Sequence, residues 1–360
     1  MPEAVGQIGD FVADDRLSPV AYYESLTGRA DDAARRAGGK VDRFYRVAGF
    51  TLRFRFAGPA LVPRLSPALA HLSSDPVDDP DLTVSLWDSV STATAMLPPP
   101  WKPDELRVNG EITSFMDAGL YTHYNVYHNA LTIFDAAGRN AIYWIKDAEA
   151  VPDHETCSPL FTLFHAWLSS RGRFHVHAGG VGFPDGGALL VGQCGSGKSN
   201  TGLACLDSPL FYAGDDRCIV AADPEPWVYS IYSTAKTHPE DLERLTFLRR
   251  RKEELFYLQN GKLLYFLDAL FPGRMIEGFP LKVILMPRVS GKRDTTFERG
   301  SPAAGLLALA PDTSIRWPSA GLSTLRNLSA LFRTVPVYQL NVGTEVGQIP
   351  AVIQEILGRA

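Results

Sequence analysis

The sequence predicts an α+β domain over residues 1–150 and an α/β domain over residues 151–360, a division that suits a chain of 360 residues. Before residue 150, short runs of alternating polarity follow one another closely, which is typical of a sheet built from neighbouring strands. Beyond residue 170, a buried apolar run leads into a glycine-rich loop and a helix. A further apolar run ends in two adjacent aspartates, at the strand end where α/β sheets bind ligands.

The composition is typical of a cytoplasmic globular protein. Apolar residues make up 45%, charged residues 21%, and the formal net charge is −5. This balance argues against a nucleic-acid binder, which usually carries a basic domain. The N-terminus lacks the features of a signal peptide, and no apolar run approaches the roughly 18 residues of a membrane span. The cysteines show no CxxC spacing, so we expect reduced thiols; they are Cys157, Cys194, Cys205 and Cys218.

The first domain is expected to be rich in strands. Phe50–Phe56 and Leu82–Trp87 alternate between apolar and polar residues, the pattern of half-buried strands. The close spacing of the later strand-like runs predicts antiparallel pairing; these runs lie at 121–127, 131–134 and 141–145. Asp31–Arg36 is expected to form a short helix that ends at Gly38.

The second domain is expected to alternate strands and helices. Apolar residues recur at helical spacing over 158–170, and Arg173–Phe183 is expected to form one strand. Ala188–Val191 is expected to be a short buried strand that runs into the glycine loop. The remaining expected elements are a helix at 199–206, strands at 210–214, 281–287 and 335–340, and a last helix that starts at Pro350.

The glycine loop matches the pattern G-x-x-x-x-G-K-[ST] without departure. Glycines let backbone N–H groups wrap around phosphate oxygens where a Cβ would clash. The lysine brings a positive charge to the terminal phosphates, and the serine hydroxyl can bind Mg²⁺. A strand precedes the loop and a helix follows it, which favours a nucleotide site over a glycine-rich surface turn. The expected ATP-binding residues are Gly192, Gln193, Cys194, Gly195, Ser196, Gly197, Lys198, Ser199 and Asn200.

Asp215 and Asp216 follow the apolar run Leu210–Gly214. The carboxyl ends of parallel strands share one edge of an α/β sheet, so these carboxylates are expected beside the glycine loop. One carboxylate can hold Mg²⁺, and the other can accept the proton of an attacking hydroxyl. The alternative is a simple turn with solvated charges.

Two histidines alternate on the expected strand before the loop, so only one of them can face the site. His177 is the candidate rather than His175, because Ala178, Gly179 and Gly180 leave space for a phosphate or a substrate. The alternative is a structural histidine within a strand.

Two basic stretches lie further along the chain. The run Arg249–Glu254 mixes charges of both signs, which favours a solvated helix face over an anion clamp or a substrate lid. Arg288 follows an expected buried strand, where a cation would offset charge on a transferring phosphoryl group.

The order of histidine, glycine loop and aspartate pair resembles the HPr kinase/phosphorylase family, and more closely its shorter relatives found with peptide-modification enzymes. The resemblance covers roughly residues 158–360. It implies an α/β P-loop kinase core of the kind shared with phosphoenolpyruvate carboxykinases, preceded here by the α+β domain. The matching segments are His177–Gly180, Gly192–Ser199, Gly214–Asp216, Val335–Leu340 and Ile349–Pro350.

The resemblance also implies an activity, the ATP-dependent phosphorylation of a serine hydroxyl. Asp215 corresponds to the proton-accepting aspartate, Asp216 to the metal-associated one, and His177 to the histidine before the loop. The sequence has Ala178 where the family usually has glycine, and it lacks the family's Arg-Gly signature after the core. Lys236 lies in the region comparable to that signature.

The sequence thus predicts a kinase that uses ATP and Mg²⁺, with Lys198, Asp215 and His177 as catalytic residues and Ser199 and Asp216 at the metal. The acceptor is expected to be a hydroxyl on a peptide, a protein or a small molecule, recognised by the first domain. A kinase for a free metabolite and a nucleotide-regulated binding module without transfer are the rival hypotheses. The oligomeric state stays open, a homo-oligomer included.

Overall fold

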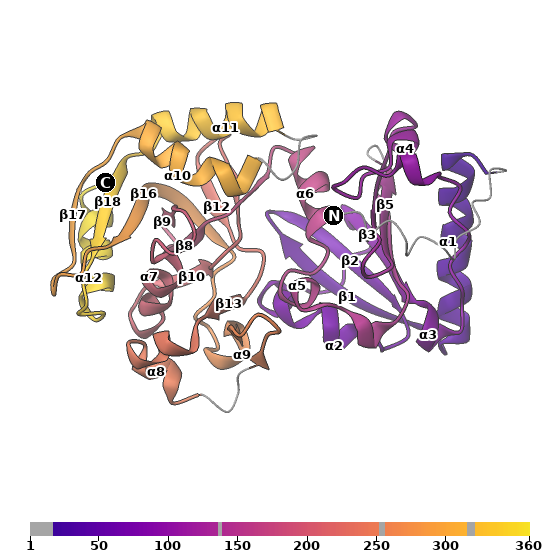
Figure 1. Ribbon diagram of the computed structural model, residues 1–360, viewed down its shortest axis with the longest axis horizontal. Helices are drawn as coiled ribbons and strands as arrows, with labels where there is room; N and C mark the ends of the chain where they lie inside the picture. Colours follow the sequence, from indigo (N-terminus) through magenta and orange to yellow (C-terminus); the bar gives the residue numbers. More distant parts are fainter. Residues whose placement is uncertain (1–16, 136–138, 252–255, 315–320) are drawn as a thin grey trace. The chain divides into compact units, whose positions relative to one another are not determined.

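The computed structural model describes residues 17–135, 139–251, 256–314 and 321–360, and it divides into two compact units (Figure 1). The first unit runs to Pro67 and continues over Ser73–Trp167. The second comprises Ala68–Leu72 and Leu168–Ala360. No helix in the described ranges combines the length and apolar character needed to cross a membrane.

The boundary between the units lies within helix α6 (Phe161–Ser169) rather than at residue 150. The side chains of this helix explain the difference. Phe164 stacks on Phe54, with ring centroids 6.2 Å apart, and Trp167 packs edge-on against Phe50 at 5.3 Å. Both partners lie on a strand of the first unit, so most of α6 belongs to that unit.

The first unit is a mixed six-stranded sheet in the order β1-β2-β3-β6-β5-β4. The expected antiparallel pairing holds for β4, β5 and β6, but β3 runs parallel to both of its neighbours. Parallel neighbours need a longer connection than a hairpin, and sequence spacing alone does not reveal it. The strands are β1 (Lys40–Val47), β2 (Phe50–Ala57), β3 (Leu82–Asp88), β4 (Leu120–Asn125), β5 (Ala130–Asp135) and β6 (Asn140–Ile145).

Helix α1 (Pro19–Arg36) packs against this sheet and is longer than the helix expected at Asp31–Arg36. It begins after Ser18, whose hydroxyl accepts from the N–H of Ala21 at 3.2 Å, and proline occupies its first turn. Its buried face includes Tyr22 and Leu26. The unit also contains the short helices α2 (Val62–Leu65), α3 (Ser89–Thr92), α4 (Thr113–Asp117) and α5 (Asp153–Cys157).

The carboxyl group of Glu155 in α5 is half-buried, and we expect it to make the stability of the first unit depend on pH. Burial raises the pKa of Glu155 to about 7, although the side chain accepts a hydrogen bond from the N–H of Leu160 at 2.7 Å. Its stabilising contribution is therefore complete below pH 4.5 and is lost as pH rises through about 7. Glu155→Gln should gain about 3 kcal/mol relative to wild type between pH 4.5 and pH 8.

Thermal unfolding at both pH values, followed by tryptophan fluorescence, measures this difference. Trp87 and Trp144 report on the unit because both are buried in its core. Glu149→Gln is the matched control, since the Glu149 side chain is 79% exposed. A difference between Glu155→Gln and wild type that is the same at both pH values would contradict the prediction.

The second unit is built on a nine-stranded sheet whose path runs β10-β8-β9-β16-β12-β11-β7, with β18 on β16 and β17 on β18. The strands are β7 (Phe174–Val176), β8 (Gly179–Phe183), β9 (Gly186–Leu190), β10 (Phe211–Gly214), β11 (Cys218–Ala221), β12 (Trp227–Tyr229), β16 (Gly278–Val289), β17 (Thr296–Arg299) and β18 (Val337–Val342). A separate three-stranded sheet contains β13 (Thr234–Thr237), β15 (Leu263–Phe266) and β14 (Phe256–Tyr257).

The single strand expected over Arg173–Phe183 is two strands, β7 and β8. They pair with different partners: β7 with β11, and β8 with β9 and β10. Only His177 and Ala178 separate them, although β7 is the last strand at one end of the sheet path and β8 is the second strand from the other end. The sheet therefore curls back on itself, and His177 lies at the point where the chain crosses from one end to the other.

Strand directions bring several carboxyl ends to one edge of the sheet. β9 and β18 each run parallel to β16. β10 is antiparallel to β8, which is antiparallel to β9, so β10 also points the same way as β9. The segments that follow these four strands consequently emerge at a common edge.

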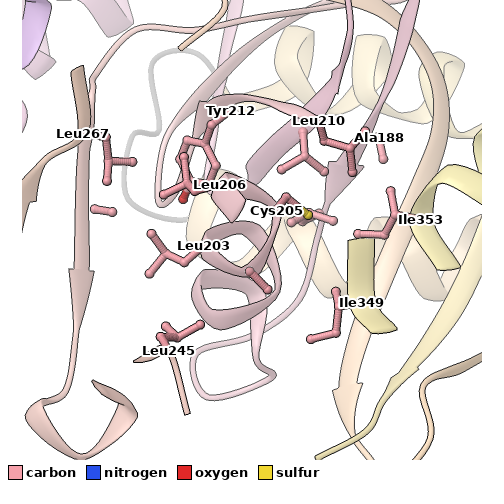
Figure 2. Close-up of a cluster of buried hydrophobic side chains, with 14 of the residues drawn as sticks. Ala188, Leu203, Cys205, Leu206, Leu210, Tyr212, Leu245, Leu267, Ile349 and Ile353 are labelled. Atoms are coloured by element: carbon pink, nitrogen blue, oxygen red, sulfur yellow. The ribbon is translucent and has the colours of Figure 1, made fainter. Parts of the chain in front are cut away.

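Two apolar cores cover the faces of this sheet. In the first, α7 (Lys198–Ala204) and the turn Cys205–Asp207 pack between α12 (Gln348–Gly358) and a layer that includes Leu245 and Leu267 (Figure 2). The second includes side chains of α10 (Pro302–Ser314) and α11 (Gly321–Thr334). The expected helix after the glycine loop, the strands at 281–287 and 335–340, and the last helix are all confirmed. The other helices are α8 (Thr246–Arg249) and α9 (Leu267–Leu270).

Candidate active site

The glycine loop connects β9 to α7 at the common edge. Its entry is fixed, because the Val191 N–H donates to the carbonyl of Leu285 on β16 at 2.9 Å. A Cβ at Gly192 would lie 2.5 Å from the Ser196 hydroxyl oxygen. Gly197 has φ +98°, and a Cβ there would lie 3.2 Å from Val289 at the end of β16. Both glycines are therefore required by the loop's conformation.

Lys198 is held inside the loop. The residue is 6% exposed, and its ammonium group donates to the carbonyls of Gly192 at 2.5 Å and Gln193 at 3.1 Å. The cation thus lies where the loop backbone curves around it. A phosphate group that entered the loop would meet this charge directly.

Asp215 and Asp216 follow β10 at the same edge. A Cβ at Gly214 would lie 2.5 Å from the Arg217 carbonyl, so only glycine allows the tight turn that presents the two acids. Asp215 is 3% exposed, while the Asp216 side chain is 34% exposed. The two carboxyl groups therefore have different environments despite being neighbours.

Lys236 on β13 contacts both aspartates. Its backbone N–H donates to Asp215 Oδ2 at 3.1 Å, and its ammonium nitrogen lies 3.2 Å from Asp216 Oδ2. The strand register pairs Lys236 with Leu264 of β15, which fixes its position along β13. No local sequence pattern links this lysine to the acid pair, from which it is separated by about 20 residues. Only the family resemblance indicated its region.

The environments of the two acids shift their pKa values in opposite directions. Burial and the neighbouring charge of Asp216 raise the pKa of Asp215 to about 7, against hydrogen bonds from Ser199 and Lys236. Partial burial acts to raise the pKa of Asp216, but the charges of Lys236, His177 and Arg217 outweigh it and hold that pKa below its usual range. At neutral pH, Asp216 is therefore ionised, whereas Asp215 keeps its proton to a higher pH than an exposed aspartate does.

Of the two histidines, His177 lies near the acid pair and His175 does not. His177 is half-buried, and its charge helps to lower the pKa of Asp216. His175 is 2% exposed within β7, and its ring faces Tyr232 at 6.5 Å. Gly179, one of the small residues after His177, is packed closely against the end of β10. A Cβ at Gly179 would lie 3.2 Å from two carbonyls of the β10 end, so glycine permits close strand packing.

The other predicted site residues differ in their exposure and their contacts. Gln193 and Cys194 are exposed at its tip. The Asn200 amide turns away from the loop and donates to Asp241 Oδ1 at 2.8 Å. Arg288 is exposed, and its guanidinium donates to Asn341 on β18.

The run Arg249–Glu254, whose mixed charges favour a solvated helix face, is helical only at Arg249 in the described residues. α8 ends at Arg249, and the part of that run beyond residue 251 lies outside the described residues. In the described part of the chain, no cluster of three or more histidine, cysteine, aspartate or glutamate side chains could hold a metal ion on its own.

Comparison with known proteins leaves the family open. No protein-family model matches the sequence, and no curated protein matches it either. Among solved structures, the chain is similar to the HPr(Ser) kinase/phosphatase from Coxiella burnetii, with 10% identity and a TM-score of 0.29. The match covers 51% of this chain and 97% of that one. At this TM-score the fold of one chain cannot be assigned to the other.

Proposed function

We propose that the second unit binds a nucleoside triphosphate with Mg²⁺ and transfers the terminal phosphoryl group to a hydroxyl acceptor. The observation that carries this proposal is the meeting of the glycine loop with the acid pair. Ser199, the last residue of the loop pattern, forms a hydrogen bond that lowers the pKa of Asp215 at the end of β10. Ser199 follows a loop that holds a buried cation, and Asp215 is followed directly by the second acid, Asp216. A hydroxyl, a cation and carboxylates gathered in this way suit phosphoryl transfer.

The residues present fit a magnesium ion. Asp215 Oδ1 is buried and has no hydrogen-bond partner among the described residues, so its bonding is incomplete. The Ser199 hydroxyl and the ionised Asp216 would supply further oxygen ligands. Mg²⁺ is usually held by one or two carboxylates together with phosphate oxygens and water. A magnesium site therefore does not require a cluster of three metal-binding side chains. Ser199 and Asp216 would hold the ion, and when bound it would offset the negative charge of the phosphates.

The two aspartates suit different roles. Asp215 has a pKa close to neutral pH, which is the range in which a general base accepts a proton efficiently. We propose that it takes the proton of the acceptor hydroxyl. Asp216 stays ionised beside Lys236 and His177, which suits a metal-associated acid. Lys198 would hold the terminal phosphates in the loop, and His177 would act through Asp216.

Lys236→Met should lower the transfer rate by about 10²-fold, by analogy with the loss of one charged donor from such a site. The variant loses the ammonium 3.2 Å from Asp216 but keeps the backbone N–H that bonds Asp215. Nucleotide affinity should change only a few-fold, and Lys236→Arg should restore part of the rate. Lys262→Met, a lysine next to β15, is the matched control. An equal loss in Lys262→Met would assign the effect to the small sheet rather than to the contact with Asp216.

The acceptor carries a hydroxyl on a peptide, a protein or a free metabolite. The described part of the first unit contains no loop of the G-x-x-x-x-G-K-[ST] pattern. We therefore propose acceptor recognition as its role.

The test is transfer of label from γ-labelled ATP to serine-containing peptides and to small alcohols, beside a nucleotide-binding titration. The proposal predicts label in an acid-stable phosphate ester on one acceptor class, dependent on Mg²⁺; on a serine-containing peptide this ester is also labile to alkali. Label on small alcohols alone would identify a metabolite kinase. Tight ATP binding without transfer to any acceptor would favour the binding module, and the absence of ATP binding would reject the site.

A further inference from the structure

A basic cavity lies beside the end of α7 that is farther from the glycine loop. Leu206 and Asp207 line it, and they belong to the turn that follows α7. The glycine loop ends at Lys198, where α7 begins, so the cavity and the loop lie at opposite ends of the same short segment. The cavity volume is about 500 Å³, within the usual range for a site that binds a small molecule. We refer to it as the basic pocket.

The wall of the basic pocket is partly aromatic. Phe247, from α8, and Phe271, after α9, both line it, and their rings pack edge-on at 6.0 Å. The Arg251 guanidinium lies over the Phe271 ring, 4.9 Å from its centroid. This contact orients a planar cation at the pocket wall beside an apolar surface.

Arg274 forms a second, immobilised cation in the wall. Its guanidinium donates to the carbonyls of Ser208 at the start of the β10 connection and of Leu210 at 2.7 Å. It also lies over the Phe211 ring at 5.6 Å. These contacts hold the connection between α7 and β10, so Arg274 has a structural role as well as a charge.

The charge balance of the lining is positive. Arg250, Arg251 and Arg274 face the pocket, and Asp207 is the one acid among the lining residues in the described part of the chain. Arg250 is exposed. An oxyanion that entered would therefore meet guanidinium groups, whose planar donors suit phosphate and carboxylate oxygens.

We propose that the basic pocket binds a small molecule that carries a phosphate or carboxylate group on an apolar or aromatic body. The guanidinium groups of Arg250 and Arg251 bind the oxyanion, and the rings of Phe247 and Phe271 contact the body. This binding does not depend on the proposed kinase activity, because the pocket shares no lining residue with the glycine loop or the acid pair.

The experiment is a calorimetric titration of the full chain with phenyl phosphate, which combines an oxyanion with an aromatic ring. The wild type should bind it saturably, with an affinity that falls as salt is raised. Arg250→Gln combined with Arg251→Gln should weaken binding about tenfold or more, since charge-assisted hydrogen bonds are lost. Arg274 is left unchanged because it holds the carbonyls of Ser208 and Leu210.

Two control variants distinguish binding in this pocket from binding elsewhere on the protein. Arg249→Gln removes one positive charge from the same segment, but Arg249 does not line the pocket. If direct contact rather than long-range electrostatic attraction binds the ligand, the affinity of this variant for phenyl phosphate should stay within about twofold of wild type. Lys198→Ala should also retain binding, because the glycine loop is a different site. Circular dichroism confirms that each variant is folded.

Three results would overturn the proposal. If phenyl phosphate shows no saturable binding at millimolar concentration, the pocket is not an oxyanion site. Equal weakening in Arg249→Gln and the double variant assigns the effect to surface charge. Loss of binding in Lys198→Ala with retention in the double variant assigns the ligand to the glycine loop.

Discussion

Lys198→Ala is expected to lower phosphoryl transfer by about 10²–10³-fold, the usual loss when one preorganised donor leaves a charged transition state. The ammonium group is held inside the loop by the carbonyls of Gly192 and Gln193. Alanine removes both the charge and the two contacts that shape the loop. Nucleotide affinity should fall as well, because the same cation would contact the phosphates before transfer begins.

Lys282→Ala is the control for this variant. Lys282 lies on β16 with its side chain exposed, so its removal takes away one positive charge outside the site. A nucleotide titration and a transfer assay on the same preparations measure both effects. Transfer at the wild-type rate in Lys198→Ala, with the fold intact, would exclude the glycine loop as the active site.

The features of this site that sequence predicted are those set by short-range patterns. The loop pattern places glycine at 192 and 197. The contact that requires glycine at 192 lies within the loop, whereas the contact at 197 is with Val289 on β16, so the pattern marks this position although its packing partner is distant in the sequence. The apolar run before Asp215 likewise marks a strand end without reference to the rest of the chain. Local polarity and spacing are therefore sufficient to locate the loop and the two acids.

The features that sequence missed depend on long-range pairing. The sequence predicts one apolar strand where the structure has β7 and β8, because the bend at His177 does not change the pattern of apolar and polar residues. The two strands differ only in their pairing partners, which are β11 for β7 and β9 for β8. The parallel neighbours of β3 have the same origin. The family resemblance indicated the region of Lys236, but no local sequence pattern predicts its contact with the acid pair, which it makes from another sheet.

The side-chain contact of Asn200 also depends on a segment that is distant in the sequence. Its position directly after the loop pattern made it a candidate for nucleotide binding. The structure pairs its amide with Asp241, which also accepts a hydrogen bond from the His238 N–H at 3.2 Å. The partner lies in a turn after β13, so the side chain's direction is set by a segment that the loop pattern does not include.

Asp215→Asn is expected to lower the transfer rate by about 10²–10⁴-fold while nucleotide affinity stays within a few-fold, because a positioned base contributes to transfer and not to phosphate binding. Asparagine has nearly the same size and can still accept the N–H of Lys236. The transfer assay and the nucleotide titration are done on the same variant. If transfer persists at the wild-type rate, Asp215 is not the base. If affinity falls as far as the rate, the carboxylate acts on the bound phosphates or the metal instead.

The same substitution has an independent consequence for stability, measured without nucleotide or Mg²⁺. Burial and the neighbouring Asp216 raise the pKa of Asp215 on folding, so the folded protein binds this proton more tightly than the unfolded chain. The stability that this proton provides is complete below pH 3.8 and is lost as pH rises through about 7. Asp215→Asn carries no such proton, so its unfolding temperature should rise relative to wild type between pH 5 and pH 8. A variant that is less active yet more stable at pH 8 would show that the buried acid is retained at a cost in stability. An unchanged difference between the two pH values would mean that Asp215 is not held in the buried environment described here.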